Sequence, residues 1–148
     1  MSASDVLVAN HPIEYVYTRS TGPVIGAFMT ALRDRRIVGV RASDGRVLVP
    51  PAEYDPVTSE DLSEIVEVGD AGEVVTWAWN DTPRKGQPLD RPFAWALVKL
   101  DGADTGLLAA VDAGDASAMS TGMRVKARWA DNRVGSIRDL VCFDVVSA

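Results

Sequence analysis

The chain is short of the residues that hold most protein metals and disulfides. It has one cysteine, Cys142, and one histidine, His11. A single cysteine excludes an intramolecular disulfide and any metal site built on several cysteines. A single histidine near the start of the chain argues against a histidine-based catalytic triad or metal centre. The sequence therefore predicts a protein that is not an enzyme by itself and that needs no cofactor.

Long apolar runs and an excess of cations are also missing. No apolar stretch approaches the roughly 20 residues that cross a bilayer, and the first residues do not resemble a secretory signal. We therefore expect a cytoplasmic protein with no membrane partner. The net charge is −6 and the isoelectric point is about 4.7, which argues against nucleic-acid binding because that affinity comes largely from clustered cations.

Apolar strands separated by short turns fill the second half of the sequence. Residues 92–111 predict two strands joined by a turn at Asp101 and Gly102, a dipeptide that accepts positive φ easily. Further strands are expected over 72–80, 123–129 and 137–145, with residues 65–68 starting the barrel. About five strands with short turns indicate a closed or partly open barrel. Alternation puts Val75, Trp77 and Trp79 on one side of the first long strand, where they fill the core or meet a partner.

The first sixty residues show mixed patterns. Residues 13–18 fit a short strand or an extended arm. Residues 23–36 predict an amphipathic helix capped by Thr21 or Gly22, whose apolar face packs on the chain's own core or on a partner. Residues 37–49 predict a hairpin, and the following segment, rich in proline and acidic residues, predicts an ordered loop.

This order of parts resembles the acyl-CoA-associated OB-fold family, once catalogued as a domain of unknown function. The resemblance rests on four stretches: RIVGVRASDGRVLVPPAEYDPVT, GEVVTWAWN, PFAWALVKLDGADTGLLAAV and GMRVKARW. It implies an α+β, mainly β fold in three parts: an N-terminal arm and helix over 1–36, a rubredoxin-like zinc ribbon over 37–62 and a five-stranded OB barrel over 63–148.

The chain departs from the family pattern at the zinc ligands. Aligned with the family, the positions of the four cysteines fall at or near Ala42, Gly45, Asp55 and Thr58. None of these residues offers the thiolate that a structural zinc site requires. We therefore predict a metal-free ribbon in which hairpin turns and local side-chain hydrogen bonds replace the zinc crosslink.

Members of the family act beside thiolase-superfamily enzymes or acyl-CoA hydratases as non-catalytic subunits, some of them in sterol side-chain degradation. The resemblance thus implies a thiolase-like or hydratase-like partner, with direct contact to acyl-CoA as a further possibility. We expect the helix and the ribbon to form the partner surface. The candidate interface residues are Phe28, Leu32, Val47, Val49, Trp77 and Trp79.

Contact with the phosphates of CoA would require cations. Two groups are available: Arg84 and Lys85 on a long polar loop, and Arg124, Lys126 and Arg128 along one face of a strand. For each of these cations, the ordinary alternative to phosphate binding is a side chain that is simply solvated on the surface. The same cations beside the tryptophans also leave open a second function, an OB-fold module for single-stranded nucleic acid, against which the acidic balance counts.

Overall fold

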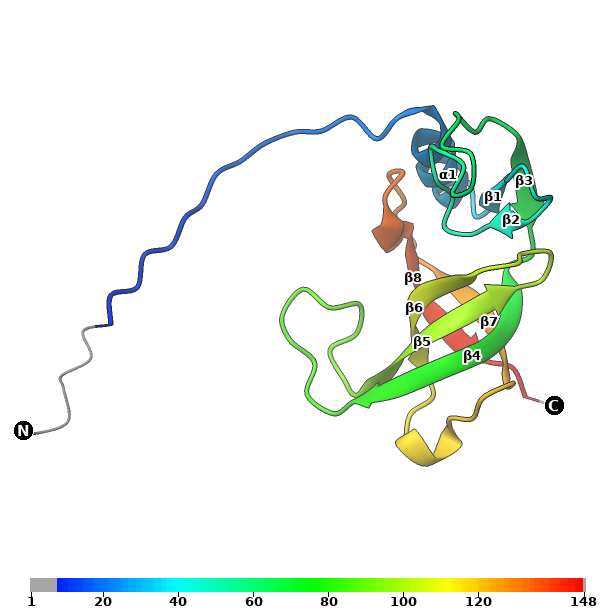
Figure 1. Ribbon diagram of the computed structural model, residues 1–148. Helices are drawn as coiled ribbons and strands as arrows, with labels where there is room; N and C mark the ends of the chain where they lie inside the picture. Colours follow the sequence, from blue (N-terminus) through cyan, green and yellow to red (C-terminus); the bar gives the residue numbers. More distant parts are fainter. Residues whose placement is uncertain (1–7, 148) are drawn as a thin grey trace, which may run out of the picture.

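The computed structural model describes residues 8–147 and shows one helix, a small sheet and a barrel (Figure 1). The helix α1 spans Pro23–Arg33, and the strands β1, Ile37–Arg41, and β2, Val47–Leu48, follow it. Next come β3, Ile65–Val68, and β4, Ala71–Asn80. The remaining elements are β5, Phe93–Leu100, β6, Gly106–Asp112, η1, Ala116–Ala118, β7, Arg124–Trp129, η2, Ile137–Asp139, and β8, Leu140–Val145. Within the described residues, no helix has the length and apolar content that a membrane crossing requires.

The helix begins where the sequence predicts and ends three residues earlier than expected. Gly22 is its N-cap residue but offers no side chain for capping. The carboxylate of Glu53 takes that role, accepting hydrogen bonds from the backbone N–H groups of Val24 and Ile25 at 3.2 and 2.8 Å. Arg35, with φ of 58°, breaks the helical path. An acidic side chain from the loop over 50–62 thus fixes the helix start, where a negative charge is favourable.

The small sheet has the order β2-β1-β3, and all of its pairs are antiparallel. The predicted hairpin is present, with Val40 opposite Leu48. The expectation that residues 65–68 start the barrel is wrong, because β3 pairs with β1 and with no barrel strand. Its register places Ile37 opposite Val68. A four-residue apolar strand carries no sign in its sequence of which neighbour it will join.

Five strands close the barrel in the order β4-β5-β6-β8-β7. The predicted hairpin of β5 and β6 is confirmed, with its turn at Asp101 and at Gly102, whose φ is 90°. The strand predicted over 137–145 begins only at Leu140, because Ser136 caps a short 3-10 turn, η2, before it. The α+β, mainly β fold with a five-stranded barrel is as predicted.

A β-bulge in β4 makes the side-chain alternation differ from the predicted one, so that Val75 does not share a side with Trp77 and Trp79. The pairing with β5 shifts between Val74 and Thr76, so Val74 is buried whereas Val75 is 45% exposed. Trp77 and Trp79 lie on the side of Val74 and pack against the core. The bulge inserts one residue and so reverses the alternation that a regular strand would keep.

The helix, the small sheet and the barrel share one hydrophobic core. Phe28 and Leu32 of α1, Ile37 of β1 and Val49 after β2 belong to the same buried cluster as the inner residues of the barrel strands. Hydrogen bonds add to this contact: the Val47 N–H donates to the Asp104 carboxylate at 2.8 Å. The ribbon segment is therefore packed directly on the hairpin turn between β5 and β6.

Candidate functional site

The barrel has an opening between β6 and β8. These two strands are parallel neighbours and pair only at Val111 with Phe143 and at Asp112 with Asp144. Before those points the strands diverge. Residues 106–110 of β6 therefore have β5 on one edge and, within residues 8–147, no strand on the other. A groove of about 490 Å³ lies there, and its apolar lining includes Trp95, Leu107, Leu108, Ile137 and Val141.

The loop over 81–92 forms a second wall of this groove through Gly86, Gln87 and Pro88. It is anchored at two points. The Gln87 side-chain oxygen accepts hydrogen bonds from the Asn80 amide at 3.0 Å and the Arg84 backbone N–H at 2.9 Å. Leu89 is buried with Phe93, Ala110 and Cys142 on the outer face of the barrel. Sequence analysis singled out this loop for its length but not Gln87 or Leu89, whose roles depend on distant neighbours.

The two predicted groups of cations differ in the structure. Arg84 and Lys85 are exposed on the loop that borders the groove, and neither forms an ion pair within residues 8–147. The cations of β7 are all paired: Arg124 with Asp101, Lys126 with Asp70, and Arg128 with carboxylates of β6 and β8. The predicted cationic strip is thus neutralised, and the loop pair is the better candidate for binding an anion.

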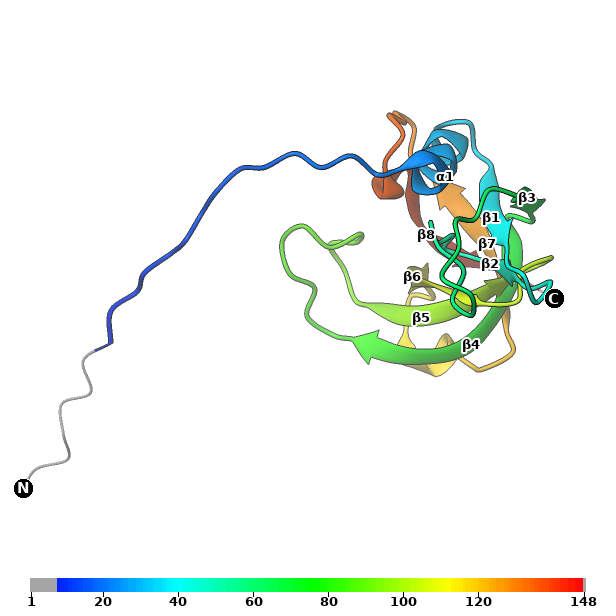
Figure 2. The same ribbon diagram turned by 45° about the horizontal axis from the view of Figure 1, so that its top comes forward.

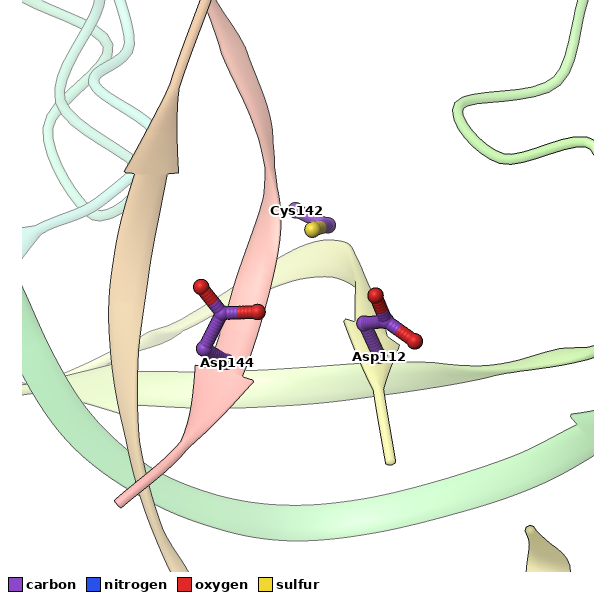
Figure 3. Close-up of side chains that lie close together, drawn as sticks. All are labelled: Asp112, Cys142 and Asp144. Carbon is purple, nitrogen blue, oxygen red and sulfur yellow. The ribbon is translucent and has the colours of Figure 1, made fainter. Parts of the chain in front are cut away.

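Arg128 is the centre of a charge cluster on the outer face of the barrel. Its guanidinium donates to Asp112 at 2.8 Å and to Asp144, with Nε 3.0 Å from Oδ2, and Arg91 also pairs with Asp112. These carboxylates lie beside Cys142 (Figure 3). Burial raises the pKa of the Cys142 thiol to about 11, so the thiol stays protonated near neutral pH. The cluster is therefore an ion-pair network and neither a metal site nor a nucleophile.

Four predicted interface residues are not available to a partner. Phe28 is 2% exposed, Val47 5%, and Leu32 and Val49 are fully buried. Trp77 and Trp79 are partly buried against the same core. The prediction that the apolar face of the helix and ribbon meets a partner is wrong for these buried side chains, because the barrel of this chain covers that face.

Two turns of the ribbon, over 42–46 and 55–59, lie side by side and are here called the knuckle. Asp55, at one of the positions where the family has a zinc ligand, links these two turns. Asp55 is 3% exposed. One of its oxygens accepts the Ser43 N–H at 2.7 Å, and the other accepts the N–H groups of Val57 and Thr58 at 2.7 and 3.0 Å. These bonds hold the pKa of the Asp55 carboxyl well below its usual range. The carboxylate thus joins the two turns that a zinc ion would join.

The residues at the knuckle do not fit a zinc ion. Of the four ligand positions, Ala42 packs in an apolar cluster with Val40 and Leu48, and Gly45 has no side chain. The Asp55 oxygens are already occupied by backbone donors. A tetrahedral zinc site needs four good ligands, which this set does not supply.

Comparison with known proteins identifies the barrel. Residues 65–130 match the family model described as ChsH2, C-terminal OB-fold domain. This part of the chain is similar to the C-terminal OB-fold domain of ChsH2. The resemblance that the sequence predicted is thereby confirmed. A search of curated proteins found no match.

Solved structures show the same fold over most of the chain. A DUF35-family protein of unknown function from Sulfolobus solfataricus is 21% identical, with a TM-score of 0.60 over 84% of this chain and 83% of that one. A structure described as the Ltp2-ChsH2(DUF35) aldolase is also 21% identical, with a TM-score of 0.62 over 86% of this chain and 98% of that one. This chain thus shares its fold with both structures at low sequence identity.

Proposed function

We propose that this chain is the non-catalytic accessory subunit of a thiolase-like or aldolase-type acyl-CoA enzyme. The observation that carries the proposal is the match of residues 65–130 to the family model of the ChsH2 C-terminal OB-fold domain. It is supported by the likeness to the chain from the Ltp2-ChsH2(DUF35) aldolase, which extends over 98% of that chain. By this proposal the reaction takes place in the partner, with sterol side chains or related acyl groups as substrates.

The chemistry of the described residues supports a non-catalytic role. His11 lies exposed in the N-terminal arm, Cys142 is buried with a raised pKa, and the carboxylates beside it are bound to arginines. A nucleophile needs a base within hydrogen-bond reach. The Ser117 hydroxyl does donate to the Asp115 carboxylate at 2.6 Å, but this exposed pair caps the short 3-10 turn η1. The chain therefore offers surfaces rather than reactive groups.

The groove beside β6 suits contact with an acyl-CoA in the assembled enzyme. Its walls are apolar, which suits an acyl or pantetheine chain, and Arg84 and Lys85 are exposed on the adjoining loop. Phosphates are bound by such cations. In this role the chain would hold part of the substrate while the partner carries out the reaction.

Affinity capture of the tagged chain from its native cytoplasm, with mass spectrometry of the eluate, tests the proposal. We expect a thiolase-fold or hydratase subunit in a near-equal amount. Elution of the chain alone, or with nucleic acid, would overturn the accessory role.

A second measurement compares CoA binding to the complex before and after Arg84→Ser and Lys85→Ser, with Arg46→Ser as a matched control on the exposed surface. Equal binding in all three variants would exclude the loop as a phosphate site.

A further inference from the structure

The N-terminal arm, residues 8–21, has no partner within the described part of the chain. It forms no regular element and runs away from the body in both views (Figures 1 and 2). Five of its side chains are large, apolar and 73 to 101% exposed: Val8, Ile13, Tyr15, Val16 and Tyr17. An unstructured tail in water is normally polar, so this composition calls for a surface that covers it.

Within the arm, residues 13–18 have the pattern of a β-strand. Isoleucine, tyrosine, valine and threonine are strong strand formers, and they make up five of these six residues. Alternation places Ile13, Tyr15 and Tyr17 on one face. The rings of Tyr15 and Tyr17 accordingly lie together, with centroids 5.7 Å apart. The segment is extended, apolar on one face and without a neighbouring strand.

The arm concentrates exposed apolar residues in a short stretch, whereas those of the body are spread along the chain from Tyr54 to Val146. The face of α1 is covered by the chain's own barrel, and the arm holds five of the fifteen large apolar side chains that are exposed among the described residues. Two tyrosines can bury about 300 to 500 Å². Ile13 adds to this area on the same face, so the docked strand supplies a large part of the roughly 800 Å² that each partner contributes to a standard interface.

We propose that residues 13–18 dock as an added strand on an open sheet edge of the thiolase-like partner. This inference rests on the proposed function and names the element that makes the contact. Backbone hydrogen bonds would pair the strand with the edge, and an apolar wall on the partner would receive Ile13, Tyr15 and Tyr17. The arm orders on binding, which lets it reach a partner surface beyond the body of this chain.

The unpaired edge of β6 is the competing acceptor, either in the same chain or in a second copy. The arm runs away from the body and from β6 in both views (Figures 1 and 2). A partner edge is therefore the acceptor to which the inference commits, and self-association becomes an outcome of the test.

The experiment compares three variants with the wild type. The first replaces the apolar face of the arm with serine at positions 13, 15 and 17, and the second is Tyr15→Pro, which removes a backbone donor but keeps the other side chains. The matched control is Tyr54→Ser with Val57→Ser, two residues on the ribbon loop that are 63 and 67% exposed. Each is titrated against the purified thiolase-fold subunit identified by capture, and folding is followed by the melting temperature.

We expect binding at least 30-fold weaker for both arm variants, on the order of a lost hot spot, with wild-type affinity for the control. The melting temperature should be unchanged, because the side chains at positions 13, 15 and 17 are 73 to 85% exposed. Equal binding by all variants would overturn the docking strand but leave the accessory role intact. Capture of no thiolase-fold subunit by the wild type would overturn both. Loss of a wild-type dimer in the arm variants, without a change in partner binding, would assign the arm to a second copy.

Discussion

Asp55 is the residue that most changes the expected chemistry of this fold. In a zinc ribbon, the metal joins two turns that have little other contact. Here the carboxylate of one residue accepts N–H groups from its own turn, at Val57 and Thr58, and from the opposite turn, at Ser43. Hydrogen bonds to an ionised group are stronger than neutral ones, so one side chain can supply much of the crosslink.

Asp55→Asn should weaken the knuckle through a single bond. The remaining carbonyl oxygen can still accept from Val57 and Thr58, but the amide NH₂ would face the Ser43 N–H. We expect a melting temperature lower by about 5 °C, measured by circular dichroism. Glu60→Gln is the control, since that exposed side chain accepts no hydrogen bond in residues 8–147. An unchanged melting temperature in Asp55→Asn would show that the link between the turns contributes nothing.

Two buried carboxylates, those of Asp55 and Asp139, should make the folded protein less stable in acid. Hydrogen bonds from Ser43, Thr58 and Val57 lower the pKa of Asp55. Burial acts to raise the pKa of Asp139, but bonds from Val134, Ser136 and Gly135 outweigh it and lower that pKa as well. A carboxyl with a lowered folded pKa stabilises fully above its unfolded pKa of about 3.9 and loses this effect as the pH falls.

The melting temperature of the wild type should therefore fall as the pH is lowered from about 5 towards 2. A variant with Asp55→Asn and Asp139→Asn should start lower at pH 7 and fall less over the same range. Asp131→Asn, an exposed residue of a neighbouring turn, is the control. Parallel curves for the wild type and the double variant would mean that other groups control the acid transition.

At the scale of elements, the closure of the barrel depends on few backbone contacts. β6 and β8 share two residue pairs, and the two strands are also joined by side chains. Arg128 of β7 bonds to Asp144 of β8 and to Asp112 of β6, so one guanidinium spans all three strands. The fork geometry of arginine allows this double contact, whereas lysine offers a point charge.

Arg128→Met should destabilise the protein by about 1 to 3 kcal/mol, because it leaves Asp112, whose side chain is 8% exposed, with fewer partners. Arg128→Lys should recover only part of the loss. Chemical denaturation measures both. Arg46→Met is the control, since its solvent-exposed pair with Asp44 should contribute little to stability. Equal losses for Arg128→Met and Arg46→Met would contradict a role in barrel closure.

Regular elements were predictable, and their exceptions were not. The hairpin of β5 and β6 follows from two apolar runs around Asp101 and Gly102, which are local signals. The bulge at Val75 has no local signal, because it depends on the register with β5. The burial of Phe28 and Val49 also had no local signal, since apolar residues look alike whether the chain itself or a partner covers them.

At the scale of the whole molecule, the candidate site combines predictable and unpredictable parts. Arg84 and Lys85 were found from the length and composition of their loop. Gln87 and Leu89, which anchor that loop, were missed because their partners lie on β4 and on the outer face of the barrel. The pairing of the β7 cations could not be predicted, because Asp70, Asp101 and Asp144 come from three other segments.

The stability of the whole chain should not depend on metal. The helix, the ribbon and the barrel share one apolar core, and the knuckle is crosslinked by Asp55. We expect the same melting temperature with and without EDTA, and far less than one equivalent of zinc by elemental analysis. A zinc-binding homologue that keeps its four cysteines serves as the positive control and should melt lower in EDTA. One equivalent of zinc in this protein would contradict the metal-free ribbon.

The charge of the whole molecule separates the two functions that the sequence left open. Nucleic-acid affinity comes from cations that release counterions at phosphates, but the net charge here is −6 and the β7 cations are each bound to a carboxylate. We therefore expect no binding of a 20-nucleotide single-stranded DNA, measured by fluorescence anisotropy, at protein concentrations up to about 10 μM and low salt. As a matched test, Asp101→Asn and Asp70→Asn free Arg124 and Lys126 from their ion pairs and should raise any residual affinity. Tight binding by the wild type that weakens steeply with salt would instead support the nucleic-acid module.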